Sequence, residues 1–238
     1  MIRILYLIIG LCAAVVMSSC HRNRVAQDVL NRADSLMEEH ADSAMSLLRL
    51  DSVTFLRTTQ QLRMAYILSK TEAEDKLYIT HRSDSAMQLA VKYFDRHGTA
   101  LQRTRAWYLL GRIYCDMLLY GNALTAFDAA LAVQPDDDST VCRYKARASS
   151  WAGSVYEEKN LHKDALRYNK MAYDYARRAD VPTVLVYSLR DIGRSYWAIG
   201  KIREATSYYL NAATKSDSLK NGYLYNMVME ELASIYIE

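Results

Sequence analysis

Residues 104–137 read TRAWYLLGRIYCDMLLYGNALTAFDAALAVQPDD, and this stretch decides the fold. Apolar residues recur at steps of three and four over residues 101–117 and again over residues 121–133. That spacing is typical of two amphipathic helices. Pro135 follows the second run, and proline has no N–H to donate within a helix. The stretch therefore predicts a pair of helices that ends before Pro135.

The side chains along the two predicted helices differ in size in a regular way. Gly111 and Ala123 are small and would allow the helices to approach closely, while Trp107, Tyr114 and Phe127 would supply bulk around the contact. After Pro135, residues 136–140 offer carboxylate and hydroxyl oxygens that can cap the next helix.

The spacing resembles that of the tetratricopeptide repeat (TPR), a 34-residue helix–turn–helix unit. The residues that match its pattern are Trp107, Leu110, Gly111, Tyr114, Ala123, Phe127, Ala130 and Pro135. The resemblance implies an all-α protein whose helical hairpins stack into a right-handed solenoid.

The pattern recurs downstream at intervals longer than 34 residues. The matching residues are Gly153, Tyr156 and Ala165 in one copy, and Gly193, Tyr196, Ala205 and Tyr209 in the next. Ser149 and Asn169 stand where the first of these copies should have large aromatics. We expect Trp151 and Tyr168 to supply the missing bulk there.

Upstream the glycine is absent, but residues 41–45 are echoed by residues 83–87. Aligned alanines of the second helices form a series, Ala44, Ala86, Ala123, Ala165 and Ala205. The series predicts about five TPR-like hairpins plus a C-terminal helix, an α-solenoid over residues 27–238.

The first twenty residues have the layout of a secretory signal: Arg3, an apolar run over residues 4–17, then two serines and Cys20. The run is shorter than the roughly 20 residues that span a bilayer. Residues 17–20 resemble the lipobox of bacterial lipoproteins, in a form similar to that of Bacteroidetes. The resemblance implies a signal peptide over residues 1–19, acylation of Cys20 by a fatty acid such as palmitate, and a tether over residues 20–26. An ordinary signal peptide or an uncleaved anchor are the alternatives.

The absence of acidic residues just after Cys20 favours a periplasm-facing protein in the bacterial cell envelope. Cys115 and Cys142 then remain, and we expect them to be small buried thiols rather than a disulfide. A formal net charge of +3 gives no indication of nucleic-acid binding.

The sequence holds no motif of an active site, a phosphate loop or a metal site. The TPR resemblance instead implies an inner groove lined by first helices. The groove residues predicted by register are Arg105, Tyr108, Arg112 and Asp116 in the best-matching unit, Arg147, Ser150, Ser154, Glu157 and Glu158 in the next, and Tyr187, Arg190, Arg194 and Trp197 in the last. Arg190, Arg194 and Trp197 form the favoured contact patch, because guanidinium groups beside rings suit carboxylates and extended peptides. The alternative is a solvated helix face.

These observations predict a membrane-anchored, non-catalytic scaffold for protein–protein interaction, with no metal or cofactor and an unidentified protein or peptide partner. Reversing the charges of Arg190 and Arg194 should then weaken partner binding and leave the fold intact. Two alternatives are the sensor portion of a longer membrane-bound signalling or transcription regulator, and an envelope-assembly lipoprotein.

Overall fold

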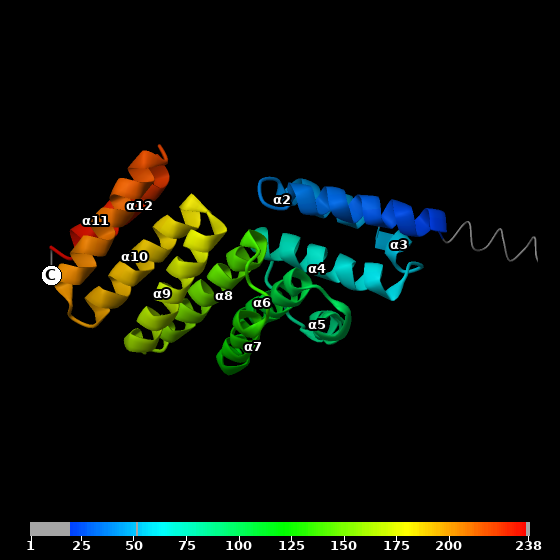
Figure 1. Cartoon of the computed structure of the whole chain (residues 1–238), viewed down its shortest axis with the longest axis horizontal. Helices are drawn as coiled ribbons and strands as arrows, with labels where there is room; N and C mark the ends of the chain where they lie inside the picture. The colour runs from blue at the N-terminus through cyan, green and yellow to red at the C-terminus, as the bar shows by residue number, and fades with distance from the viewer. Residues whose placement is uncertain (1–19, 51, 237–238) are drawn as a thin grey trace, which may run out of the picture. The chain divides into compact units, whose positions relative to one another are not determined.

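The computed structural model describes residues 20–50 and 52–236, and these residues form helices joined by short connections, with no strand among them (Figure 1). The chain divides into two compact units, Met1–Tyr93 and Phe94–Glu238, here called unit 1 and unit 2. The division falls within helix α5, Ser85–His97.

Unit 1 is built on helical residues 20–36, followed by α2 (Ala41–Leu50), the short α3 (Ser52–Phe55) and α4 (Gln60–Lys76). Residues 20–36 and α4 run in the same direction. Ser69 Oγ donates to Asp34 Oδ1 at 2.7 Å, and Lys76 Nζ lies 2.9 Å from Glu38 Oε2. Apolar residues from all four segments form one buried core, which includes Ala26, Leu48, Phe55 and Leu62.

Unit 2 continues with seven helices in the part of the chain that the structure describes. They are α6 (Ala100–Asp116), α7 (Tyr120–Ala132), α8 (Ser139–Glu158), α9 (His162–Ala179), α10 (Pro182–Ala198), α11 (Ile202–Ser218) and α12 (Gly222–Ser234). Each of the pairs α6–α7, α8–α9 and α10–α11 packs as a hairpin, and α6, α8, α10 and α12 also contact one another in sequence (Figure 1).

The prediction of an all-α helical-hairpin solenoid is confirmed. In chain order the described helices give the five expected pairs and then α12, with α3 inserted after the first pair. Residues 1–19, which the sequence assigns to a signal peptide, lie outside the described residues. Residues 20–26, assigned to a tether, are helical. None of the described helices is both long and apolar enough to cross a bilayer.

The helix ends follow the sequence signals. α7 ends at Ala132, before Pro135, and Asp138 caps α8. Its Oδ1 accepts hydrogen bonds from the backbone N–H of Thr140 at 2.7 Å and Val141 at 3.1 Å. The prediction that the acidic run caps the next helix is therefore correct for Asp138.

Close approach of the paired helices depends on the repeated glycine. A Cβ built on Gly111 would lie 2.4 Å from the Phe127 ring, and one on Gly193 would lie 3.2 Å from Tyr209. The 2.4 Å contact would force the Phe127 ring or its helix to shift, whereas the 3.2 Å contact at Gly193 would need a movement of a few tenths of an ångström. The packing therefore favours a small residue at both positions and most strongly at Gly111.

The aligned alanines are fully buried at Ala44, Ala123, Ala165 and Ala205, but Ala86 is exposed. The buried residues of α5 are instead Met87, Ala90, Val91 and Phe94. The alignment based on residues 83–87 was wrong by one position, because the motif was matched without a helical period to fix which residue faces inward.

Candidate functional site

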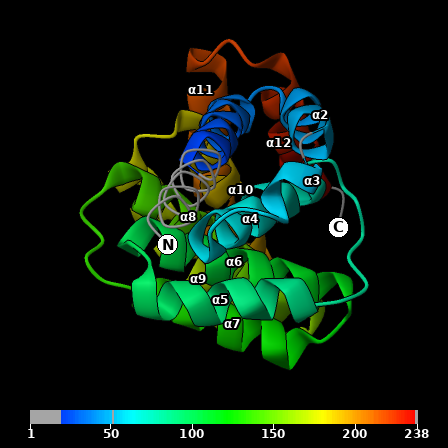
Figure 2. The same cartoon turned by 90° about the vertical axis from the view of Figure 1, so that its right-hand side faces the viewer.

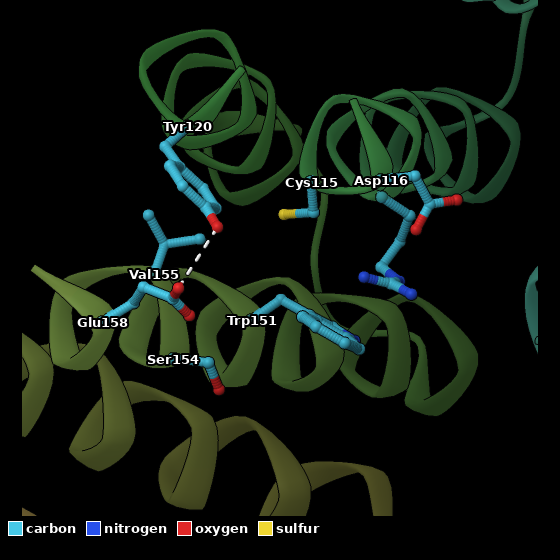
Figure 3. A pocket seen from close by; sticks show the side chains of 8 residues that line it. Cys115, Asp116, Tyr120, Trp151, Ser154, Val155 and Glu158 are labelled. Atoms are coloured by element: carbon cyan, nitrogen blue, oxygen red, sulfur yellow. Dashed lines mark hydrogen bonds between the residues drawn. The ribbon is translucent and has the colours of Figure 1, made fainter. Parts of the chain in front are cut away.

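A pocket of about 190 Å³ opens between α6, the start of α7 and α8 (Figure 3). Its lining combines charged, aromatic and small side chains, and consists of Arg112, Cys115, Asp116, Tyr120, Trp151, Ser154, Val155 and Glu158. The volume is below the roughly 300–1,000 Å³ of small-molecule sites, and it suits one side chain of a partner.

The pocket lies on the predicted groove face. Arg112 and Asp116 come from the first helix of one hairpin, and Ser154 and Glu158 come from the first helix of the next. The register derived from the TPR pattern placed all four on the inner surface. Packing of α6 against α8 brings them together, although they are about 40 residues apart in sequence.

One wall of the pocket is a cation–π pair. The Arg112 guanidinium carbon lies 3.4 Å from the centroid of the Trp151 ring. Arg112 is buried, whereas Trp151 keeps 37% of its surface exposed. The prediction that Trp151 fills the core in place of Ser149 was therefore wrong. The sequence could not show that Trp151 stacks on Arg112, because Arg112 belongs to the preceding hairpin.

The opposite wall holds oxygen acceptors. The Tyr120 hydroxyl donates to Glu158 Oε1 at 3.4 Å (Figure 3), and Ser154 Oγ donates to the Ser150 carbonyl at 3.2 Å. Because the Ser154 proton is used within its helix, its oxygen can accept from a ligand. The lining thus combines acceptor oxygens with a partly exposed indole that already stacks on Arg112, and the acceptor oxygens suit a hydrogen-bond donor of a partner.

Other predicted groove residues lie outside this pocket. Tyr108 is buried, with its ring centroid 5.8 Å from that of Tyr144 and 6.5 Å from that of Phe127. Such a side chain contributes to the core and offers no surface to a partner. Arg105 is half-buried on α6 and does not line the pocket.

Arg190 and Arg194 take part in a network of charges, here called the α10 network. Both guanidinium groups bond Asp191 Oδ1, Arg190 Nη2 at 2.6 Å and Arg194 Nη2 at 2.5 Å. Asp191 is itself buried. Glu157 of α8 and Glu231 of α12 complete the network, with Arg194 Nη1 3.6 Å from Glu157 Oε2 and Arg194 Nε 3.6 Å from Glu231 Oε2.

Asn169 connects the α10 network to the core. It is buried against Gly153, at the position where the repeat normally has an aromatic. Its Nδ2 lies 3.0 Å from Glu157 Oε1 and 3.0 Å from Ser195 Oγ. Desolvation raises the pKa of the Glu157 carboxyl, Arg194 opposes this and Asp191 adds to it. The polar residue in the repeat is therefore satisfied by groups on two other helices.

The α10 network changes what is expected of the predicted contact patch. Two arginines face three carboxylates, so both guanidinium groups are already engaged within the chain. Reversing both charges would place five carboxylates together, and like charges at this distance are strongly unfavourable. We therefore expect the double reversal to destabilise unit 2. Trp197 and Tyr187 are half-buried and pack against the core of α10–α12.

Three further side chains with reactive groups are those of Lys145, Cys115 and Cys142. Lys145 is fully buried and donates to the carbonyls of Leu131 at 2.8 Å and Val133 at 2.6 Å, which satisfies the C-terminal end of α7. Cys115 and Cys142 are not joined by a disulfide; Cys142 is buried as expected, whereas Cys115 is only half-buried and lines the pocket. Across residues 20–50 and 52–236, no cluster of three or more His, Cys, Asp or Glu could hold a metal ion.

Comparison with known proteins supports the fold. Apo RapI superposes with a TM-score of 0.66 at 16% identity, covering 88% of this chain and 83% of that one. BtubC from P. vanneervenii gives 0.62 at 17% identity, covering 89% and 91%. TTC0263, a TPR protein of Thermus thermophilus, gives 0.52 at 18% identity, covering 90% and 100%.

No family model and no curated protein matches the chain. The structural likenesses nevertheless agree with the succession of helical pairs. The chain has a TPR-like fold.

Proposed function

We propose that the protein is a non-catalytic scaffold for protein–protein interaction, held on a membrane of the bacterial cell envelope by a lipid on Cys20 and facing the periplasm. The observation that carries the proposal is the pocket between α6 and α8, because it is assembled from groove positions of two consecutive hairpins. TPR-like neighbours support a role in binding proteins or peptides.

Recognition would need no covalent step. An extended segment of the partner would lie along α6 and α8 and place one side chain in the pocket. The exposed part of Trp151 gives contact area, and the Glu158 carboxylate accepts hydrogen bonds from a donor group. Buried indoles and desolvated charges are the contacts that most often dominate such interfaces.

A photo-crosslinking amino acid at Ser154 tests the binding face in native envelopes. Ser154 is exposed and lines the pocket, whereas Asp174 is exposed on α9 and serves as the matched control. We expect a discrete crosslinked product from the Ser154 site that is lost when Glu158→Gln is added. Equal products from both sites, or a product unaffected by Glu158→Gln, would remove the pocket from the binding face.

The lipid anchor has its own test. Cys20 is exposed at the start of the described chain. Cys20→Ala should abolish metabolic labelling by a fatty-acid analogue, while Cys115→Ala should leave labelling unchanged. Labelling that persists in Cys20→Ala would overturn the lipoprotein assignment.

A further inference from the structure

Unit 1 carries a group of exposed apolar side chains at one end, here called the α3 patch. It comprises Val25, Leu50, Val53 and Leu56, which are 38%, 82%, 68% and 73% exposed. Isolated exposed leucines are ordinary, but grouped large apolar residues indicate a surface that contacts another apolar phase.

The α3 patch is held in place by the core. Phe55 is buried and stacks on Tyr66, with ring centroids 4.4 Å apart. The Thr58 hydroxyl donates to the Phe55 carbonyl at 2.8 Å, and Arg63 Nη1 donates to the Thr58 carbonyl at 2.6 Å. α3 also packs against α2 and α4 (Figure 2). With Phe55 turned inward and anchored, Val53 and Leu56 remain directed outward.

The patch lies at the end of unit 1 where the described chain begins. Arg22 Nη1 donates to the Arg57 carbonyl at 3.5 Å, which places residue 22 beside the end of α3. Cys20, the residue proposed to carry the lipid, lies two residues before Arg22. The exposed apolar side chains and the proposed lipid attachment site therefore share one end.

Charge at this end has one dominant sign. Within three residues of the patch members the sequence has Arg22, Arg24, Arg49 and Arg57 against Asp28 and Asp51, a net charge of 4 − 2 = +2. Arginines that surround exposed leucine and valine match a bilayer surface with anionic headgroups, because apolar groups enter the acyl boundary and cations pair with phosphates.

We propose that the α3 patch inserts into the headgroup region of an anionic membrane and gives unit 1 a second membrane contact beside Cys20. The proposal rests on the membrane anchoring proposed above. Two contacts would fix the orientation of unit 1 on the bilayer, whereas a lipid on Cys20 alone would leave it free to rotate.

The test uses the full-length chain reconstituted in vesicles that contain phosphatidylglycerol and a brominated phosphatidylcholine. Bromine quenches only tryptophans that enter the acyl region. Leu56→Trp adds a probe in the patch, and Tyr78→Trp adds a matched probe at the far end of α4, about 25 Å away for a helix of this length. The emission of the chain with its three native tryptophans is subtracted.

We expect the added emission of Leu56→Trp to be lost in brominated vesicles and that of Tyr78→Trp to be retained. Retention in both variants would overturn the proposal and would favour a protein partner for the patch. Flotation of the vesicles is measured in parallel. If the protein floats with the vesicles while the emission of Leu56→Trp is not quenched, the lipid anchor holds and the α3 patch does not insert. If the protein does not float, both the lipid anchor and the insertion of the patch are contradicted.

A second pair of variants tests whether quenching of Leu56→Trp depends on the rest of the patch or only on the introduced tryptophan. Adding Val53→Glu to Leu56→Trp should restore the emission while flotation through the anchor persists, whereas adding Ser46→Glu on the exposed side of α2 should not. Quenching that survives Val53→Glu would also contradict insertion of the patch.

Discussion

The contact between α6 and α8 and the contact among α8, α10 and α12 use the same face of successive first helices, yet they end in different surfaces. Arg112 and Arg194 each follow the repeated glycine directly and so occupy equivalent positions. Arg112 lies over the Trp151 ring beside an open pocket. Arg194 keeps 37% of its side chain exposed but lies within 3.6 Å of carboxylates from three helices.

The difference shows that the neighbouring hairpin decides the role of a repeat position. Where the next helix presents an indole, the guanidinium stacks and leaves acceptor oxygens and a cavity beside it. Where Glu157 of α8 and Glu231 of α12 approach, the same group forms ion pairs with them and with Asp191 of its own helix, and so links α8, α10 and α12. The surface beside Arg112 is therefore suited to binding a partner, whereas the α10 network holds α8, α10 and α12 together.

The largest expected effect comes from breaking the α10 network. Asp191→Ala leaves two guanidinium groups without their shared carboxylate, but Glu157 and Glu231 remain beside them and Arg194 is 37% exposed, so we expect a cost of roughly 2 kcal/mol, below that of breaking a fully buried pair. Chemical denaturation followed by circular dichroism should show this loss in free energy of unfolding. Asp174→Ala, at an exposed site on α9, should change it by less than about 0.5 kcal/mol. Equal effects would contradict the cohesive role.

Breaking the cation–π wall should have a smaller effect. Arg112→Ala removes the stacked guanidinium from Trp151, and such pairs contribute about 1 kcal/mol. The same denaturation measurement, together with a shift in tryptophan emission, checks this expectation. Arg203→Ala, on the exposed side of α11, is the matched control. An unchanged emission spectrum in Arg112→Ala would show that the stacking does not persist in solution.

The carboxyl groups of Glu157 and Asp138 should make the free energy of unfolding depend on pH in opposite directions. Because the pKa of Glu157 is raised in the folded chain, its contribution is fully present below the ordinary value of 4.5 and declines as pH rises above it. The pKa of Asp138 is lowered by the backbone N–H of Val141 and Thr140, so its contribution is lost as pH falls below 3.8.

Thermal melts of Glu157→Gln and the wild type across this range provide the measurement. The melting temperature of Glu157→Gln should rise relative to that of the wild type as pH increases above 4.5. Asp138→Asn should instead be most destabilising at neutral pH, with the difference shrinking in acid. A pH-independent difference for Glu157→Gln would show that this carboxyl titrates normally.

The smallest effect on stability is expected at the pocket rim. Glu158 is exposed, and Glu158→Gln keeps its size while removing its charge, so the free energy of unfolding should change by less than about 0.5 kcal/mol. Crosslinking from Ser154 should nevertheless fall. A large loss of stability in Glu158→Gln would place this residue with the α10 network and would abolish the distinction between the two surfaces.

Much of the fold could be predicted from particular residues. Gly111, Ala123 and Phe127 mark a close helix pair, because a Cβ at Gly111 would collide with the Phe127 ring. Asp138 was recognisable as a cap, since capping depends on groups two and three residues away. Ala86 was misassigned because a short motif match carries no information on which face of its helix is buried.

The groove could be predicted only in part. The repeat register brought Arg112, Asp116, Ser154 and Glu158 to one face, but not the exposed Trp151 or the start of α7 at Tyr120. The register also could not show that Arg190 and Arg194 form ion pairs within the chain. Asn169 was visible as a departure from the pattern, yet its partners Glu157 and Ser195 lie on other helices.

The sequence by itself determined the helical pairs, their ends and the small residues at their contacts, because these depend on periodicity and on groups a few residues apart. Only the tertiary structure decided which arginines lie beside an open pocket and which form ion pairs between helices. That outcome depends on side chains about 40 residues away, and their charge and shape enter only when successive hairpins pack.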